Sequence, residues 1–336
     1  MSVTLKEIAK ELGVSPSTIS KALNDQPGVS EDLRNKIINA VKEKNLRPKQ
    51  RGSGLVKDNT LNIVLMVRIN QSLETDPFYA LITEGISKEL QHYRSNLLYH
   101  VLHERQPDDA LFAEIFESKS VDGAILIGAD LEPKLFERIS RLEIPAVLVD
   151  NQYPGFCSVN TDNYRGALEG LKHLAEFGHK DIVFLSGPLE HQSIRQRYQG
   201  YLDGMRNYAS EAKPALIECA GVSVDDGYRA LQAYADRSFT AVFAANDKLA
   251  IGAIKALKEV KYSIPKDISV IGFDDIEWGL HMEPALTTIR IAKHQMGSLA
   301  AQLLMHYING DAPHSVDVTV ATKLVPRQSA ATAGTR

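Results

Sequence analysis

The opening segment of the chain spaces its apolar positions with the period of an α-helix. These positions form two short groups, Ile8, Ala9 and Leu12 followed by Ile19, Ala22 and Leu23. Gly13 can end the first helix in a left-handed conformation, and Ser15 and Pro16 suit the N-cap and first position of the second. Two helices joined by so short a turn predict a helix-turn-helix, whose second helix fits the DNA major groove.

A third helix is predicted directly after this pair and ends near Asn45. Ser30 suits its N-cap, and Glu31 and Asp32 suit its positive end. Its inner stripe consists of Leu33, Ile37, Ile38 and Val41. Residues 47–60 are polar, basic and contain glycine, which is typical of a linker. We therefore predict a helix-turn-helix domain at 1–46, a hinge at 47–60 and a body at 61–336.

The body alternates short apolar runs with helical patterns. Strands are predicted at 61–67, 96–101, 121–127, 146–149, 182–185, 215–219, 241–244 and 268–271. Helices are predicted at 78–93, 109–116, 133–142, 163–177, 193–208, 225–235 and 247–260. The series breaks near 155–165, and 287–291 could cross back. The fold class is therefore α/β, a three-helix head followed by two doubly wound parallel lobes.

Charge separates the head from the body. The net charge is −4, but residues 1–57 hold eleven Lys or Arg and six Asp or Glu, a balance of +5, which leaves −9 for the rest. A basic head on an acidic body predicts that only the head meets a polyanion. Cys157 and Cys219 are too few for a disulfide framework and fit small buried side chains in a reducing cytosol. Without an apolar leader or a run long enough to span a bilayer, we expect a cytoplasmic protein with no membrane partner.

The chain lacks the sequence patterns of common enzymes. No G-x-S-x-G elbow, H-E-x-x-H pair, P-loop or G-x-G-x-x-G is present. His100 and His103 have the spacing of one helix face, but they fall at a predicted strand, so we expect no metal site. We expect no catalytic residues and no cofactor. A sugar-acting α/β enzyme and an exported solute-binding protein remain the alternatives; the first lacks catalytic motifs and the second lacks an export signal.

Six segments in order carry a resemblance to a known family. They are VTLKEIA at 3–9, VSPSTISKALN at 14–24, GHKDIV at 178–183, A-N-D at 245–247, GFDD at 272–275 and PALTTI at 284–289. The chain resembles the lactose/galactose repressor family, whose body is similar to periplasmic sugar-binding proteins. The resemblance implies a repressor that binds near-palindromic double-stranded operator DNA as a homodimer. It also implies a sugar or sugar phosphate effector in the cleft between lobes, acting as inducer or corepressor. No heptad tail follows residue 325, which favours a dimer over a tetramer.

The DNA contacts are expected on the outer face of the second helix. Its hydroxyls suit phosphates, and Lys21 can donate to guanine O6 and N7, although it could also be a solvated surface lysine. By family position, Leu55 aligns with a hinge leucine that enters the minor groove, yet Gly52 and Gly54 weaken a hinge helix, so a flexible tether is the alternative. Ser30 could contact phosphate or only cap its helix. The candidates are Leu5, Ser15, Pro16, Ser17, Thr18, Ser20, Lys21, Asn24, Ser30 and Leu55.

The effector contacts are expected at the carboxyl ends of the strands, where open α/β sheets bind ligands. The resemblance points to Arg197 for ligand oxygens, and it places Asn246 and Asp274 after two second-lobe strands. The full set is Asp76, Phe78, Tyr79, Asp150, His191, Ser193, Arg197, Asn246 and Asp274. Three of these have alternatives: Phe78 as a core anchor, Asn246 as a helix cap, and Asp274 as a cap or lobe-crossing strut.

Two positions depart from the family pattern. Relatives often carry aromatic residues where Val222 and Lys293 stand, so Trp278 is an alternative stacking platform. Lys293 in the cleft would favour an acidic or phosphorylated effector, but a surface lysine fits better. Asp247 is expected to face structure.

Overall fold

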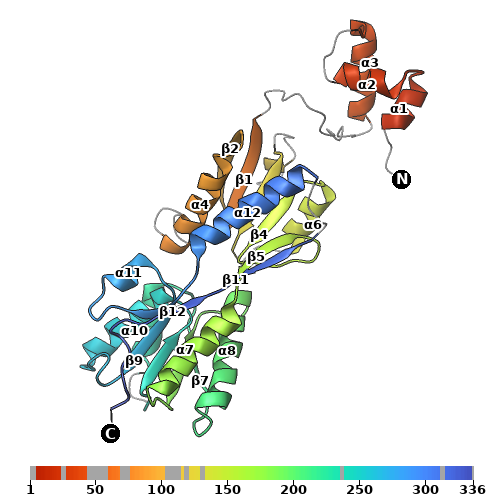
Figure 1. Cartoon of the computed structure of the whole chain (residues 1–336). Helices are drawn as coiled ribbons and strands as arrows, with labels where there is room; N and C mark the ends of the chain where they lie inside the picture. Colours follow the sequence, from red (N-terminus) through yellow and green to blue (C-terminus); the bar gives the residue numbers. More distant parts are fainter. Residues whose placement is uncertain are drawn as a thin grey trace. The chain divides into compact units, whose positions relative to one another are not determined.

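The computed structural model of the chain contains two compact units, Met1–Lys57 and Asp58–Arg336 (Figure 1). It describes residues 5–23, 28–43, 60–68, 76–102, 115–116, 121–128, 133–234, 238–310 and 315–334. The three domain boundaries expected above remain predictions. In the described part of the chain, no helix is long and apolar enough to cross a membrane.

The head consists of three helices, α1 (Leu5–Glu11), α2 (Pro16–Leu23) and α3 (Glu31–Glu43). Its core is formed by the predicted apolar residues Ile8, Ala9, Ile19, Ala22, Ile37 and Val41. Gly13 has a φ of +65°, the left-handed conformation that lets the chain turn sharply between α1 and α2. The helix-turn-helix prediction is confirmed.

The first lobe contains a six-stranded sheet in the order β11-β5-β4-β3-β1-β2, and the described pairings are all parallel. Its strands are β1 (Leu61–Arg68), β2 (Ser95–Leu102), β3 (Gly123–Ile127), β4 (Ala146–Val149), β5 (Cys157–Thr161) and β11 (Asp317–Val320). Its helices are α4 (Pro77–Leu90), α6 (Pro133–Arg141) and α12 (Lys293–Ile308). Alternating side chains of β1 serve opposite faces: Leu65 packs in the cluster that includes α4, and Met66 in the cluster that includes α6.

The second lobe contains a second six-stranded sheet in the order β12-β10-β9-β8-β6-β7, with β12 antiparallel at its edge. Its strands are β6 (Ile182–Ser186), β7 (Ala215–Glu218), β8 (Ala241–Ala244), β9 (Ser269–Asp274), β10 (Thr287–Arg290) and β12 (Lys323–Val325). Its helices are α7 (Asn163–Glu176), α8 (Gln192–Tyr208), α9 (Val224–Gln232), α10 (Asp247–Glu259) and α11 (Glu277–Leu280). Figure 1 shows these helices arranged around the second sheet. The predicted α/β class with two lobes is confirmed.

The chain passes between the lobes after β5, after β10 and after β11. The predicted crossing segment 287–291 is itself a strand, β10, which pairs with β9 inside the second sheet, so the crossing comes after it. Two further elements were not predicted. The strand β5 has the sequence CSVNT, whose polar residues break the apolar run, and α12 begins at Lys293 without the side-chain cap that marks a helix start. The edge strands β11 and β12 are short and partly exposed, so they too escaped prediction. The predicted helix at 109–116 lies mostly outside the described residues.

Candidate DNA-contact helix and effector site

The N-terminus of α2 is closed by a small hydroxyl cluster. The Ser15 Oγ accepts a hydrogen bond from the Thr18 backbone N–H at 3.1 Å, so the predicted N-cap is confirmed. The same oxygen lies 2.6 Å from the Ser17 Oγ and 2.8 Å from the Thr18 Oγ1. These hydroxyls are thus gathered at the positive end of the helix, where phosphate oxygens are stabilised.

The exposed face of α2 and its N-cap carry about half of the predicted contacts. Ser15, Pro16, Ser17 and Lys21 are exposed and Thr18 is half-buried. The helix buries Ile19 and Ala22 on the other side. Among the remaining candidates, Ser30 lies 3.4 Å from the Leu33 backbone N–H, as a cap would. Leu5 begins α1 and Ser20 lies in α2, whereas Asn24 and Leu55 lie outside the described residues.

Arg197 is buried within α8 and holds three elements of the second lobe together. Its Nε donates to the Asn163 Oδ1 at 2.8 Å, and its Nη1 donates to the Ala245 carbonyl at 2.6 Å and to the Asp274 Oδ1 at 3.1 Å. Its guanidinium lies over the Phe273 ring, 3.9 Å from the centroid. Sequence reasoning found Arg197 and Asp274 but missed Asn163, because β5, the strand that precedes it, was not predicted.

Asp274 ends β9 in a strained backbone conformation. Its φ is +111°, which a residue with a Cβ rarely adopts and which is typical of functional sites. Burial raises the pKa of its carboxyl group, and the nearby cations Arg197, Lys293 and Lys248 oppose that shift. The helix-cap alternative for Asp274 is not met, since its carboxylate binds Arg197, and its role as an effector contact stays a prediction.

Lys293 is buried at the start of α12, so the expectation of a surface lysine is wrong. Its Nζ donates to the backbone carbonyls of Asp274 and Asp275 at the crossing from β10. Burial lowers the pKa of this ammonium group, and the surrounding carboxylates oppose the shift. Because α12 was not predicted, there was no reason to expect that its first residue, Lys293, would be buried.

Asp76 connects the two lobes. Its Oδ1 accepts the Phe78 backbone N–H at 3.0 Å, which caps α4, and its Oδ2 accepts the Lys248 Nζ at 2.7 Å. Phe78 is buried in the core and makes an edge contact with Tyr79, with ring centroids 5.2 Å apart. The core-anchor alternative therefore describes Phe78. Lys248 was missed by sequence reasoning, although it follows Asn246 and Asp247 directly.

Asn246 and Asp247 have structural hydrogen bonds at the start of α10. The Asn246 Oδ1 accepts the Leu249 backbone N–H at 2.8 Å, and its Nδ2 donates to the Val222 carbonyl at 3.1 Å. Asp247 is fully buried and accepts the Thr288 hydroxyl at 2.5 Å. Burial raises the pKa of Asp247 well above its usual value. The cap alternative for Asn246 and the structural expectation for Asp247 are both met.

The remaining effector candidates lie at the end of β4 and at the start of α8. Asp150 is half-buried at the end of β4, with a φ of +54°. His191 occupies the N-cap position of α8 without a capping hydrogen bond from its side chain, and Ser193 is buried one turn before Arg197. Trp278, the alternative stacking platform, lies on α11 and is 45% exposed.

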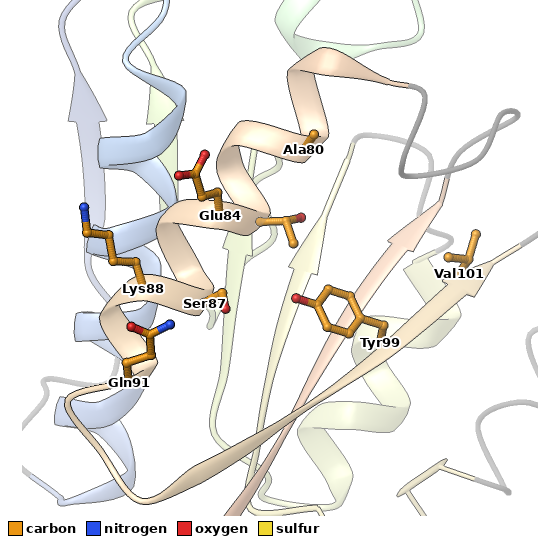
Figure 2. Close-up of a pocket in the computed structure, with 8 residues that line it drawn as sticks. Ala80, Glu84, Ser87, Lys88, Gln91, Tyr99 and Val101 are labelled. Carbon is orange, nitrogen blue, oxygen red and sulfur yellow. The ribbon is translucent and has the colours of Figure 1, made fainter.

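A separate hollow lies on the outside of the first lobe (Figure 2). It has a volume of about 790 Å³, and its lining comes from α4 and β2, with none of the candidate effector residues. The lining residues are Ala80, Thr83, Glu84, Ser87, Lys88, Gln91, Tyr99 and Val101. Thr83 is buried, and its Oγ1 has no hydrogen-bond partner in the described part of the chain.

The head is a three-helix helix-turn-helix unit of the kind that binds DNA. The body consists of two α/β lobes between which the described part of the chain passes three times, as in periplasmic binding proteins. Together they define a regulator of the helix-turn-helix class. Residues 4–49 match the model of bacterial regulatory proteins of the lacI family, and residues 171–330 match the periplasmic binding protein-like domain. The chain is 30% identical to the HTH-type transcriptional repressor PurR of Histophilus somni (strain 2336), over 98% of this chain and 99% of the relative. The chain belongs to the lacI family of bacterial regulatory proteins.

Solved structures give the same assignment. The complex of the transcriptional regulator CelR with cellobiose matches with a TM-score of 0.72 and 25% identity, over 97% of this chain and 99% of that one. The lac repressor dimer bound to operator and the anti-inducer ONPF matches with a TM-score of 0.70 and 25% identity, over 98% and 100%. The proteins that this chain resembles are regulators of transcription, and the chain is one by family.

Proposed function

We propose that the chain is a cytoplasmic, non-enzymatic repressor that binds a near-palindromic operator as a homodimer and responds to a sugar or sugar-like effector. The observation that carries the proposal is the exposed polar face of α2 on a self-contained three-helix core. Ser15, Ser17 and Thr18 present hydroxyls at a helix N-terminus, which suits phosphate, and Lys21 lies one turn further along for a base edge. Leu5, Pro16, Ser20, Asn24, Ser30 and Leu55 complete the proposed contacts.

DNA binding is tested by comparing the full chain with residues 58–336, which form a unit of their own. The full chain should bind a selected palindromic duplex with an affinity that falls steeply with salt, because phosphate contacts release counterions. Lys21→Ala should cost about 1–3 kcal/mol at its base pair, whereas Lys36→Ala, at an exposed lysine of α3, serves as the control. Equal binding by both chains, measured by fluorescence anisotropy, would reject the regulator function.

The effector is proposed to bind at the lobe boundary around Arg197 and Asp274. A planar bidentate donor beside a carboxylate acceptor suits the vicinal hydroxyls of a sugar. The cellobiose complex of CelR and the ONPF complex of the lac repressor, by their descriptions, show small molecules bound by similar proteins. Asp76, Tyr79, Asp150, His191 and Ser193 are the further proposed contacts.

A thermal-shift screen of the full chain against sugars and sugar phosphates tests this site. A true effector should raise the melting temperature, because ligand that binds only the folded state stabilises it. Arg197→Ala should remove that ligand-dependent rise, judged against the variant's own melting temperature. Arg206→Ala, at an exposed arginine on the same helix, is the matched control. An undiminished rise in Arg197→Ala would exclude Arg197 from the site.

The α4–β2 face is proposed as the surface where the two copies meet. β2 is an edge strand that exposes Tyr99 by 52% on the α4 side of the sheet, and α4 itself exposes Leu81 by 39%. Figure 2 shows Glu84 and Lys88 one helical turn apart on the same face. A two-fold axis would place each beside its opposite charge on the partner. A second copy would also cover an edge strand that otherwise invites uncontrolled pairing.

A further inference from the structure

The two lobes are joined by an ion pair between Asp76, which is also a proposed effector contact, and Lys248, which is not. The Lys248 Nζ lies 2.7 Å from the Asp76 Oδ2, and the two side chains are 14% and 6% exposed. Asp76 precedes α4 in the first lobe, and Lys248 lies in α10 of the second. The buried pairs Arg197–Asp274 and Arg327–Asp275 lie within the second lobe, whereas this pair bridges the lobes.

Both partners are fixed to the starts of their helices. Asp76 caps α4 through its other carboxylate oxygen, which accepts the Phe78 backbone N–H. Lys248 follows Asp247, whose buried carboxylate is anchored by the Thr288 hydroxyl. Because Asp76 is fixed by its cap and Lys248 has only the reach of its four-carbon stem, the ion pair restricts the relative placement of the lobes.

The pair lies away from two of the three crossings. These two leave β5 and β11 at one edge of the first sheet, whereas the third enters α12 beside α4, and Asp76 follows β1, three strands beyond β5. At about 4.8 Å between strands, this is a lever of roughly 14 Å. A rotation of about 10° about these two crossings would then separate the charged atoms by roughly 2–3 Å, which is enough to break the pair.

The pair belongs to a cluster of charged and ionisable side chains. Arg197, Lys248 and Lys293 lie among the carboxyl groups of Asp76, Asp247 and Asp274. All six side chains except that of Lys248 are buried residues, and Lys248 is nearly so. Removing one partner of such a pair leaves an uncompensated charge in a poorly solvated place, and opening the lobes is the movement that lets water reach it.

We propose that the Asp76–Lys248 ion pair is a latch that holds the two lobes in the arrangement described here before any effector binds. A body already held in the arrangement that the effector binds spends less of the effector's binding free energy on rearrangement, so losing the latch should weaken effector binding. That consequence rests on the proposed function. The arrangement itself is measured without an effector, so the latch can fail while the proposed function stands.

Pulsed electron paramagnetic resonance on the full chain measures the lobe separation. Nitroxide labels are placed at Lys134→Cys in α6 and Lys172→Cys in α7, which are exposed positions on different lobes. The native Cys157 and Cys219 are buried. The latched chain should give one narrow distance. Asp76→Asn keeps an N-cap side chain but loses the charge, and it should raise a separate distance population from about 1% to at least about 10%.

Lys248→Met should produce the same second population, and the double variant should add little beyond either single change, as expected for two partners of one interaction. Asp225→Asn is the control, because it breaks an exposed pair with Arg229 inside one helix of the second lobe. Its distance distribution should match that of the parent chain. Unchanged distributions in both Asp76→Asn and Lys248→Met, with cooperative melting retained, would overturn the latch. An equal opening in Asp225→Asn would also overturn it.

Discussion

Arg197 is a structural residue as well as a proposed effector contact. Its buried guanidinium binds Asn163, the Ala245 carbonyl and Asp274 together. We predict that Arg197→Ala lowers the free energy of unfolding by about 3–5 kcal/mol, because a buried carboxylate loses its partner. Arg206→Ala, which removes an exposed ion pair with Asp203, should change it by less than about 1 kcal/mol. Urea unfolding of the two variants checks this, and similar losses in both would contradict it.

His179 fastens the C-terminal segment to the second sheet. Its Nε2–H donates to the Ala331 carbonyl at 3.0 Å, which leaves Nδ1 to accept the Thr240 hydroxyl at 3.0 Å. Burial lowers the pKa of this imidazole, and the bond to Ala331 opposes that shift. In the sequence, His179 stood out only as part of the GHKDIV segment, and no structural role was predicted for it.

The lowered pKa gives a pH-dependent stability with a definite sign. Below the unfolded pKa of about 6.5, the unfolded chain binds more protons at this position than the folded chain. We therefore predict that the free energy of unfolding falls as the pH is lowered from about 7.5 through 6.5. His179→Asn should be less stable at neutral pH and should flatten that fall. Denaturant unfolding at a series of pH values checks the slope, and equal slopes in both proteins would refute the role of His179.

Helices α4 and α12 pack closely against each other because each has a glycine at the contact. A Cβ at Gly297 would lie 2.0 Å from the Ile82 carbonyl oxygen, and one at Gly85 would lie 2.1 Å from the His294 carbonyl oxygen. Because these neighbours are backbone atoms in helices, they cannot turn aside. Figure 1 shows α12 running beside α4. Small residues thus let α12, which follows the second crossing, pack closely against α4 in the first lobe.

We predict that Gly297→Ala destabilises the body by about 1–3 kcal/mol, since an added methyl group must push the two helices apart. Gly334→Ala is the control, because a Cβ there would meet only the Lys266 carbonyl oxygen at 3.7 Å. Thermal unfolding of both variants checks the difference. A Gly297→Ala chain as stable as the parent would show that α12 does not pack as closely as described.

Elements with continuous apolar runs were predictable, and elements with mixed patterns were not. β3 and β4 are buried along their whole length, so each consists of a continuous apolar run. These runs, at 121–127 and 146–149, predicted both strands. β5 carries Ser158 and Asn160 in its sequence, and its burial arises from neighbouring strands rather than from its own composition. Local sequence says little about such a strand, because its environment is built by segments far along the chain.

The same limit applies to the effector site. Arg197 and Asp274 were found through family motifs, and the structure brings them within hydrogen-bond distance. Asn163, Lys248 and the burial of Lys293 depend on how the lobes cross over, which periodicity does not encode. In the head, by contrast, the exposed and buried faces of α2 follow from helical spacing alone, since its core is local.

At the scale of the molecule, two units with separate cores have to act together. The head is a small cluster around Ile8, Ile19 and Ile37, and the body has its own much larger core. Operator affinity in the proposed dimer comes from two heads linked through the bodies, because the second head binds at a high effective concentration. The proposed α4–β2 face therefore affects DNA binding without touching DNA.

We predict that Tyr99→Asp separates the proposed dimer. Tyr99 is 52% exposed on the edge strand β2 and lines the hollow beside α4. In a two-fold contact each copy would bury a new carboxylate close to the partner's own, and burial of like charges without cations is costly. Tyr208→Asp, at a tyrosine of α8 that is 45% exposed, is the matched control.

Analytical ultracentrifugation should show monomers only for Tyr99→Asp. The operator affinity of that variant should fall at least about tenfold, because the second head is no longer linked to the first. A Tyr99→Asp chain that sediments as a dimer would place the contact between copies elsewhere on the body.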